Sequence, residues 1–188
     1  MLAGTDFLTV EVLTLWGLVT DYVLFFIHLE SRRIDIAGIT VHPNEQWIQQ
    51  VARNATMEGC GALRDCQYLL HDRDAKYCAS FRAIIETGRV KTLVLPARSP
   101  NLNAYSERWI RSAKEECLSK IIFFGEGSLR RALHEYVAHY HIERNHQGEV
   151  KRAAVPADHG DTWGEACAVS RAAWRAPALL PPRRRLNR

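Results

Sequence analysis

The sequence lacks long hydrophobic runs and an apolar leader. Its longest apolar stretch, residues 22–27, lies between Asp21 and His28 and is much shorter than the roughly 18 residues that a membrane-spanning helix needs. No basic segment followed by an apolar core opens the chain, so we expect neither a secretory signal nor a membrane partner. With 47% hydrophobic and 24% charged residues, the composition is that of a folded globular protein. We therefore expect a cytoplasmic protein with one main domain.

Patterns typical of disulfides and of zinc sites are also missing. The five cysteines are odd in number and form no Cys-x-x-Cys pair, so we expect reduced thiols. The spacing of four late histidines matches no common zinc site, and no cysteine lies near them: His134, His139, His141 and His146. The net charge of +4 permits a polyanionic partner without requiring one.

The positive charge is concentrated at the C-terminus. The last eighteen residues contain six arginines and no acidic residue. Such a segment suits contact with phosphates, and it suits a solvated, disordered end equally well. We expect residues 1–150 to form the folded core and residues 151–188 to form a poorly ordered basic tail.

Hydrophobic periodicity predicts the order of the elements. Three apolar, β-branched runs at 7–15, 22–29 and 34–41 are typical of an antiparallel meander. A helix capped by Asn44 and running to about Asn54 is expected next. The remaining predicted elements are a strand at 67–70, a helix at 80–86, a strand at 90–95, and helices at about 103–119 and 128–141. The order β-β-β-α-β-α-β-α-α indicates a mixed α/β sheet flanked by helices.

Two aspartates lie at the ends of predicted strands. Asp6 is predicted to open the first strand, and Asp72 follows the short apolar strand that ends at residue 70. Ligands of α/β sheets gather at such strand ends, although either residue alone could be an ordinary turn or capping aspartate. Together they are candidates for a shared polar cleft.

Glu107 is the third candidate acid. The helical repeat places it on one face with Asn103, Arg111 and Lys114. That face could be a solvated ion pair between Glu107 and Arg111, worth roughly a few tenths of a kcal/mol. Combined with two strand-end aspartates, Glu107 could instead complete a set of oxygen ligands for two divalent cations.

Four sequence blocks resemble the catalytic core of the retroviral-integrase-like family, and in particular bacterial insertion-sequence transposases. They are residues 4–7 (Gly-Thr-Asp-Phe), 70–77 (Leu-His-Asp-Arg-Asp-Ala-Lys-Tyr), 99–109 (Ser-Pro-Asn-Leu-Asn-Ala-Tyr-Ser-Glu-Arg-Trp) and 140–148 (Tyr-His-Ile-Glu-Arg-Asn-His-Gln-Gly). The 34 residues between Asp72 and Glu107 are close to the spacing that the family keeps. The resemblance covers roughly residues 3–150.

The resemblance implies a ribonuclease-H-like fold and a DDE-type site made of Asp6, Asp72 and Glu107. It implies two Mg²⁺ ions, replaceable by Mn²⁺, with Asp6 bridging both. The implied reaction is DNA strand transfer in integration or transposition. The implied partners are DNA, at the element ends and the target, and further copies of the chain when it is active. On DNA, such a protein is associated with the nucleoid.

The second block contains two aspartates, because Asp74 replaces the glycine usual in the family. Asp72 is the better ligand, since it lies nearer the strand and keeps the family spacing. Asp74 is expected to cap or orient the turn.

Basic residues near these blocks are the candidates for DNA contacts. Arg111 and Lys114 could grip phosphates of the donor end, or could be solvated surface charge. Asn103, on the same helix face, is a further candidate. Arg144 and His146 in the fourth block could contact DNA or pack the last helix against the core.

Only five residues precede Asp6, whereas full transposases carry N-terminal helix-turn-helix modules. The chain is therefore expected to be a truncated member of the family. Two alternatives stay open. One is a catalytically silent remnant that binds DNA or a full-length transposase, and the other is a plain nuclease of the same fold.

Overall fold

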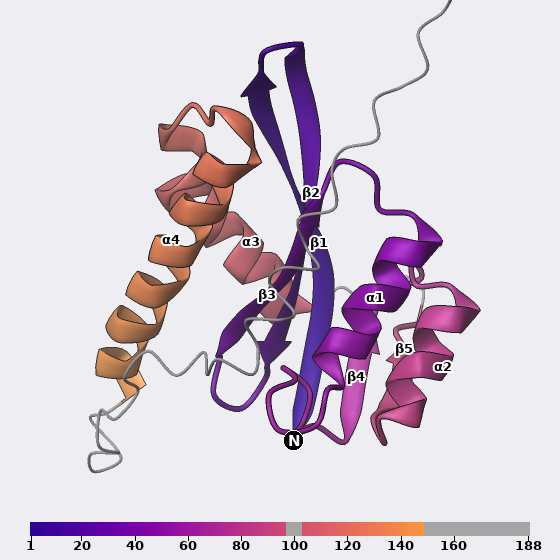
Figure 1. Cartoon of the computed structure of the whole chain (residues 1–188). Coiled ribbons are helices and arrows are strands. Elements are labelled where there is room, and N and C mark those ends of the chain that lie inside the picture. Colours follow the sequence, from indigo (N-terminus) through magenta and orange to yellow (C-terminus); the bar gives the residue numbers. More distant parts are fainter. Residues whose placement is uncertain (97–102, 149–188) are drawn as a thin grey trace, which may run out of the picture. The chain divides into compact units, whose positions relative to one another are not determined.

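The computed structural model describes residues 1–96 and 103–148 (Figure 1). Within these residues five strands form one mixed sheet in the order β3-β2-β1-β4-β5. The strands are β1 (Leu2–Thr14), β2 (Gly17–His28), β3 (Ile34–Thr40), β4 (Tyr68–His71) and β5 (Lys91–Val94). The helices are α1 (Glu45–Ala55), α2 (Ala79–Thr87), α3 (Ala104–Glu116), the 3-10 helix η2 (Leu118–Lys120) and α4 (Gly125–Gly148). The predicted tail, residues 151–188, lies outside the described part of the chain.

The predicted order of elements is confirmed. Strands β1, β2 and β3 form the antiparallel meander, while β4 pairs in parallel with β1 and β5 in parallel with β4. Asn44 caps α1 as predicted, because its side-chain Oδ1 accepts the Trp47 N–H at 2.9 Å. The fold is the mixed α/β sheet with flanking helices that the periodicity indicates.

Several boundaries differ from the prediction, and β2 begins at Gly17, five residues before the predicted start. The helix predicted at 103–119 ends at Glu116 and is followed by η2, and the last helix is longer at both ends than 128–141. Strand β1 begins at Leu2, so the prediction that Asp6 opens this strand is wrong. Parallel pairing with β4 draws residues 2–4 into the sheet, ahead of the apolar run that marked the strand in the sequence.

The two faces of the sheet carry different helices. Alternate residues of β1, including Leu8 and Val10, belong to the core formed with α3 and α4, and there Trp109 packs on Phe25 with ring centroids 4.3 Å apart. On the other face, the Phe7 ring lies beside the Trp47 ring of α1, with ring centroids 6.4 Å apart. Figure 1 shows α3 and α4 on one side of the sheet and α1 and α2 on the other.

Strand β1 is paired unevenly along its length. It pairs with β2 from Ala3 to Thr14, but with β4 only from Leu2 to Gly4. Beyond Gly4, β1 and β4 therefore separate. One consequence is a gap at the carboxyl end of β4, and another is a β1–β2 hairpin that extends past the rest of the sheet (Figure 1).

None of the helices in the described residues combines the length and the apolar character that crossing a membrane requires.

Candidate active site

Asp6 lies inside β1 on the face that α3 covers. Its carboxylate Oδ1 accepts the Phe7 N–H at 2.7 Å, and its Oδ2 accepts a hydrogen bond from the Asn103 side-chain amide at 2.8 Å. Asn103 is the N-cap residue of α3, so this bond joins the start of α3 to the middle of β1. Asp6 is thereby held in one orientation from two elements.

Gly4 lies where β1 meets both β2 and α3. A Cβ atom at Gly4 would lie 3.3 Å from the Ile27 side chain and 3.5 Å from the Ser106 hydroxyl. The first of these distances is tighter than ordinary van der Waals contact, so the Ile27 side chain would have to shift by a few tenths of an ångström, whereas the contact with Ser106 of α3 would be ordinary.

Asp72 follows the last residue of β4 directly. Gly4 of β1 pairs with Leu70 of β4, so Asp6 and Asp72 would be opposite each other if the parallel ladder continued for two more residues. The Asp72 carboxylate Oδ1 accepts the Asp74 N–H at 3.0 Å, an interaction typical of an aspartate that begins a turn. Asp72 thus lies at the point where β4 separates from β1.

Asp74 orients the turn, as the sequence predicts. Its Oδ1 accepts the Lys76 N–H at 2.9 Å, and its Oδ2 forms an ion pair with the Lys76 ammonium at 2.6 Å. Burial opposes ionisation, yet the hydrogen bonds and charge of Lys76 hold the pKa of Asp74 below its usual range. Both oxygens of Asp74 are therefore engaged within the turn.

Glu107 lies in the first turn of α3 and is exposed. Within the described residues it forms no ion pair with Arg111, so the solvated pair considered from the sequence is not formed. Its carboxylate is close enough to act on Asp6, as the pKa of Asp6 shows.

The pKa of Asp6 is raised above its ordinary value. Burial is the largest cause, and the negative charges of Asp72 and Glu107 raise it further. The hydrogen bonds from the Phe7 N–H and the Asn103 amide act in the opposite direction. Asp72 and Glu107 therefore each lie near enough to Asp6 to act on its charge.

The three carboxylates are not gathered into a finished metal site. Among the described residues, no three Asp, Glu, His or Cys side chains lie close enough together to hold one ion. The donor chemistry nevertheless suits Mg²⁺ or Mn²⁺, since all the donors are carboxylate oxygens and their charges are uncompensated. The exposed Glu107 side chain is free of ion pairs in this part of the chain and can turn toward the aspartates.

The structure describes the side chains of three of the five residues predicted to contact DNA. Arg111 and Lys114 are exposed on α3, one and two turns beyond Glu107. Asn103 is bonded to Asp6, and its predicted contact with DNA stays a prediction. The backbone of Arg144 and His146 belongs to α4, but their side chains lie outside the described residues.

A pocket of about 400 Å³ opens at Asp72 and includes two basic residues that the sequence reasoning missed. Arg73 donates from Nε to the Leu95 carbonyl at 3.2 Å, and Arg82 comes from the first turns of α2. His71 lines the same pocket, and its Nδ1 is 2.6 Å from the Asp72 carbonyl oxygen. The signal for Arg82 in the sequence was its position on the helix that follows Asp72.

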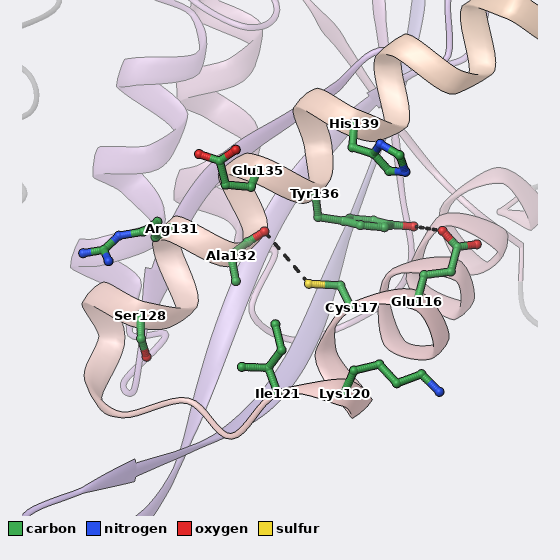
Figure 2. Close-up of a pocket in the computed structure, with 10 residues that line it drawn as sticks. All are labelled: Glu116, Cys117, Lys120, Ile121, Ser128, Arg131, Ala132, Glu135, Tyr136 and His139. Carbon is green, nitrogen blue, oxygen red and sulfur yellow. Dashed lines mark hydrogen bonds between the residues drawn. The ribbon is translucent and has the colours of Figure 1, made fainter.

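A larger pocket of about 490 Å³ lies between α3 and α4, away from the acids (Figure 2). In it the Tyr136 hydroxyl donates to the Glu116 carboxylate at 3.0 Å. Burial raises the pKa of Tyr136 and the pKa of the nearby Cys117 thiol, so both stay protonated near neutral pH. Two acids, Glu116 and Glu135, line this pocket, but the Glu116 carboxylate is engaged with Tyr136, and we do not assign chemistry to it.

A polar network at the C-terminal end of β2 was also missed by the sequence analysis. His28 Nε2 is 3.0 Å from Asp35 Oδ2, and Arg33 Nε is 3.1 Å from the same oxygen. The hydrogen bond to Asp35 is the main cause that raises the pKa of His28 to about 9, helped by the neighbouring Cys66 thiol. The network joins β2 to β3.

The fourth block of the sequence anchors α4. His141 Nε2 accepts the Ile34 N–H of β3 at 2.9 Å, and the Tyr140 ring packs against Tyr136 with centroids 6.2 Å apart. Burial lowers the pKa of His141, which keeps the ring neutral and able to accept. These two residues have structural roles.

Comparison with known proteins bears on the fold and on one segment of the chain. Residues 88–149 match the family described as Integrase core domain. Of the solved structures, the catalytic domain of Mos1 mariner transposase is similar with a TM-score of 0.56 and 16% identity, over 73% of this chain and 69% of that one. At this identity the likeness concerns the fold. No curated protein sequence matches the chain significantly.

Two retroviral structures are more distantly similar. The chain of a simian T-cell lymphotropic virus intasome matches with a TM-score of 0.47 and 8% identity, over 61% of this chain and 38% of that one. The catalytic core domain of BIV integrase matches with a TM-score of 0.46 and 10% identity, over 61% and 66%. The family match covers residues 88–149, and the likeness to the transposase catalytic domain over most of the chain concerns the ribonuclease-H-like fold.

Proposed function

We propose that the chain is the catalytic core of a DDE-type enzyme that carries out metal-dependent DNA strand transfer. The observation that carries the proposal is electrostatic. Asp6, Asp72 and Glu107 come from three elements, and the charges of the other two acids raise the pKa of Asp6. Repulsion between carboxylates destabilises the metal-free site, and a bound cation would relieve it.

Asp6, Asp72 and Glu107 would hold two Mg²⁺ or Mn²⁺ ions. When bound, the ions neutralise the anionic phosphodiester and lower the pKa of the attacking hydroxyl or water. The chain itself orients the ligands. Asn103 fixes the Asp6 carboxylate from the start of α3, and Asp74 with Lys76 holds the turn that presents Asp72.

Binding of DNA falls to the basic residues around the acids. Arg111 and Lys114 are exposed on α3 and would contact backbone phosphates of the donor end. Arg82, beside Asp72 in the 400 Å³ pocket, is a further phosphate contact on the other side of the site. We place the protein in the cytoplasm, on the nucleoid when it is bound to DNA, and expect several copies to act together.

The test uses the purified chain, a 3′-labelled DNA duplex and Mn²⁺. We expect nicked and joined products from the wild type and none above background from Asp72→Asn. The matched control is Asp65→Asn, which removes an exposed carboxylate ahead of β4 and outside the site and should retain the wild-type activity. Equal products from wild type and Asp72→Asn would overturn the enzymatic proposal and favour a silent DNA-binding remnant.

A nuclease of the same fold predicts a different pattern. It would nick the duplex in an Asp72-dependent way and never yield joined strands. A second measurement separates loss of chemistry from loss of the ion, because Mn²⁺ should raise the melting temperature of the wild type and have a smaller effect on Asp72→Asn. An equal rise in both proteins would contradict the assignment of Asp72 as a ligand.

A further inference from the structure

An arginine lies against the first turn of α3, the turn that carries Glu107. The guanidinium carbon of Arg32 is 3.3 Å from the centroid of the Tyr105 ring, so the two side chains form a cation–π contact. Arg32 belongs to the turn between β2 and β3, and Tyr105 is the second residue of α3. In the described part of the chain Arg32 forms no ion pair. The contact therefore joins two turns that are far apart in the sequence.

The backbone at Arg32 is unfavourable for an arginine. Its φ is 61°, in the left-handed region that glycine and asparagine adopt more readily than other residues. Backbone bonds close the turn, since the Arg32 N–H donates to the His28 carbonyl at 2.8 Å and the His28 N–H donates to the Arg33 carbonyl at 2.9 Å. Glycine would complete the same turn with less strain. The turn therefore does not account for an arginine at this position.

Arg89 is a second arginine with a left-handed backbone, and it serves as a comparison. Its φ is 65°, and it directly follows the C-cap of α2, where a left-handed residue commonly ends a helix. Its side chain is exposed, and among the described residues it stacks on no aromatic ring. The end of a helix explains the conformation of Arg89, whereas the conformation of Arg32 accompanies a contact of its side chain.

The first turn of α3 lacks the side-chain cap that usually holds such a turn. Asn103 is the N-cap residue, but its side chain makes no capping bond, because its amide donates to Asp6 at 2.8 Å. The helix dipole disfavours a cation near a helix N-terminus, so it does not account for Arg32 either. The contact with Tyr105 can instead replace part of the missing cap, because it ties this turn to the turn between β2 and β3.

Tyr105 and Glu107 project from different sides of this turn. Ser106 lies between them in the sequence and is buried beside Gly4 of β1. Successive residues of a helix are about 100° apart around its axis. A rotation of the turn that moves the Glu107 side chain must therefore also move Tyr105 away from Arg32.

We propose that Arg32 is a positioning residue, which holds the first turn of α3 through Tyr105 and so sets the direction of the Glu107 carboxylate. Its part in catalysis rests on the proposed function, in which Glu107 is a ligand of the metal ions. Its effect on the turn can be measured without DNA and without metal. The two proposals can therefore fail separately.

The decisive variant is Arg32→Gly, because glycine suits the left-handed backbone and only the side chain is lost. The melting temperature should stay at the wild-type value. The N–H of Glu107 donates to the Asn103 carbonyl at 3.1 Å, and in the metal-free chain its hydrogen exchange should become about fivefold faster, as for loss of a partly exposed cation–π contact. The N–H of Ala113, further along α3, should exchange as before. The matched control is Arg89→Gly, which removes the same side chain from a similar backbone conformation and should leave the exchange of Glu107 unchanged.

Variants of Tyr105 test the other half of the contact. Tyr105→Phe keeps the face of the ring and should behave like the wild type, whereas Tyr105→Ser should reproduce the faster exchange of Arg32→Gly. The double variant should exchange no faster than either single variant, because both changes remove the same contact. Additive effects of the two changes would contradict a contact that acts through Tyr105.

Binding of metal and DNA separates positioning from direct contact with the substrate. Mn²⁺ should raise the melting temperature of Arg32→Gly less than that of the wild type. In strand-transfer assays the Mn²⁺ concentration for half-maximal activity should rise about fivefold, while the dissociation constant for DNA stays the same. Exchange of Glu107 at the wild-type rate in Arg32→Gly would overturn the proposal. Weaker binding of DNA with unchanged exchange would assign Arg32 to a DNA contact instead.

Discussion

Strand β1 runs through two regions of the molecule with opposite character. Its first half is packed between α3 and α1 and carries Asp6, a carboxylate whose pKa is raised by burial and by neighbouring acids. Its second half continues with β2 beyond the other strands of the sheet. The turn that joins the two strands carries Leu15 and Trp16, which are almost fully exposed. One region keeps charge where burial disfavours it, and the other keeps apolar surface in water.

The comparison shows a cost in stability at the acids, where burial and like charge oppose ionisation, and apolar surface left in water at the hairpin. Each unfavourable feature becomes favourable only when something binds, a cation to the acids and an apolar surface to the hairpin. Regions of this kind are typical of functional sites, where stability and activity conflict. The predictions below ask whether each region behaves in this way.

The largest effect is expected at the buried end of β1. Under the proposed function Asp6 would bind the metal ions, so Asp6→Asn should reduce strand transfer on the order of 10³-fold or more. The same variant should raise the melting temperature of the metal-free protein, since the repelled carboxylate is gone while the hydrogen bond from Phe7 can remain. Activity assays and thermal unfolding without metal measure the two effects.

Glu11→Gln is the matched control for that variant. Glu11 lies on the same strand in its exposed half, so both its activity and its melting temperature should stay at the wild-type values. A metal-free Asp6→Asn protein that melts below the wild type would show that the site is not strained by charge.

Two tryptophans test the same comparison in terms of stability. Trp109 is fully buried against Phe25, and its replacement by Ala should lower the free energy of unfolding by about 3–5 kcal/mol. Trp16→Ala should change it by less than about 0.5 kcal/mol, as for a surface residue. Denaturant unfolding at a concentration where the chain is monomeric measures both. A large loss for Trp16→Ala would mean that the indole is packed within its own chain.

The sequence was informative where local signals agree with the tertiary structure. The meander, the cap at Asn44 and the order of strands and helices follow from periodicity and turn residues, and all are found in the structure. The start of β1 was missed because residues 2–4 join the sheet only through β4, a partner more than sixty residues away. Pairing between distant segments leaves no periodic signal in either segment.

The candidate site was predictable in its acids and less so in its surroundings. Spacing and resemblance singled out Asp6, Asp72 and Glu107, and they preferred Asp72 to Asp74, whose oxygens are both engaged with Lys76. The bond from Asn103 to Asp6 and the pair of His28 with Asp35 depend on how elements pack. Sequence spacing carries no information about such contacts.

A buried charge with a partner should behave differently from Asp6. The pKa of His28 is raised to about 9 by Asp35, so this pair stabilises the fold fully below pH 6.5 and loses its effect as the pH rises toward 9. Burial raises the pKa of Asp35, but His28 and Arg33 outweigh it and lower the pKa, so the contribution of Asp35 is lost only in acid. The free energy of unfolding should fall by about 3 kcal/mol between pH 6.5 and 9.

His28→Gln is the control for this pH dependence. The difference between the stability curves of wild type and variant isolates the contribution of His28 from that of the other groups. The pKa values of His71 and His141 are lowered by burial, so their contributions change below pH 6.5 and stay constant in the window. Parallel stability curves for the two proteins would contradict an ionised His28–Asp35 pair.

The smallest effect is expected at Asn103, where the two predicted roles of one residue can be separated. The bond from its amide to Asp6 predicts that Asn103→Ala lowers the rate of strand transfer about tenfold, the loss of one hydrogen bond to a charged group. If Asn103 positions Asp6, the variant should need more Mn²⁺ for half-maximal activity and should bind DNA as tightly as the wild type. If it contacts DNA, as predicted from its place on the face of α3, the dissociation constant for DNA should rise while the Mn²⁺ requirement stays the same. Asn103→Asp sharpens the distinction. It removes the donor of the bond to Asp6 and adds a fourth carboxylate that repels Asp6. If Asn103 positions Asp6, this variant should therefore lose more activity than Asn103→Ala.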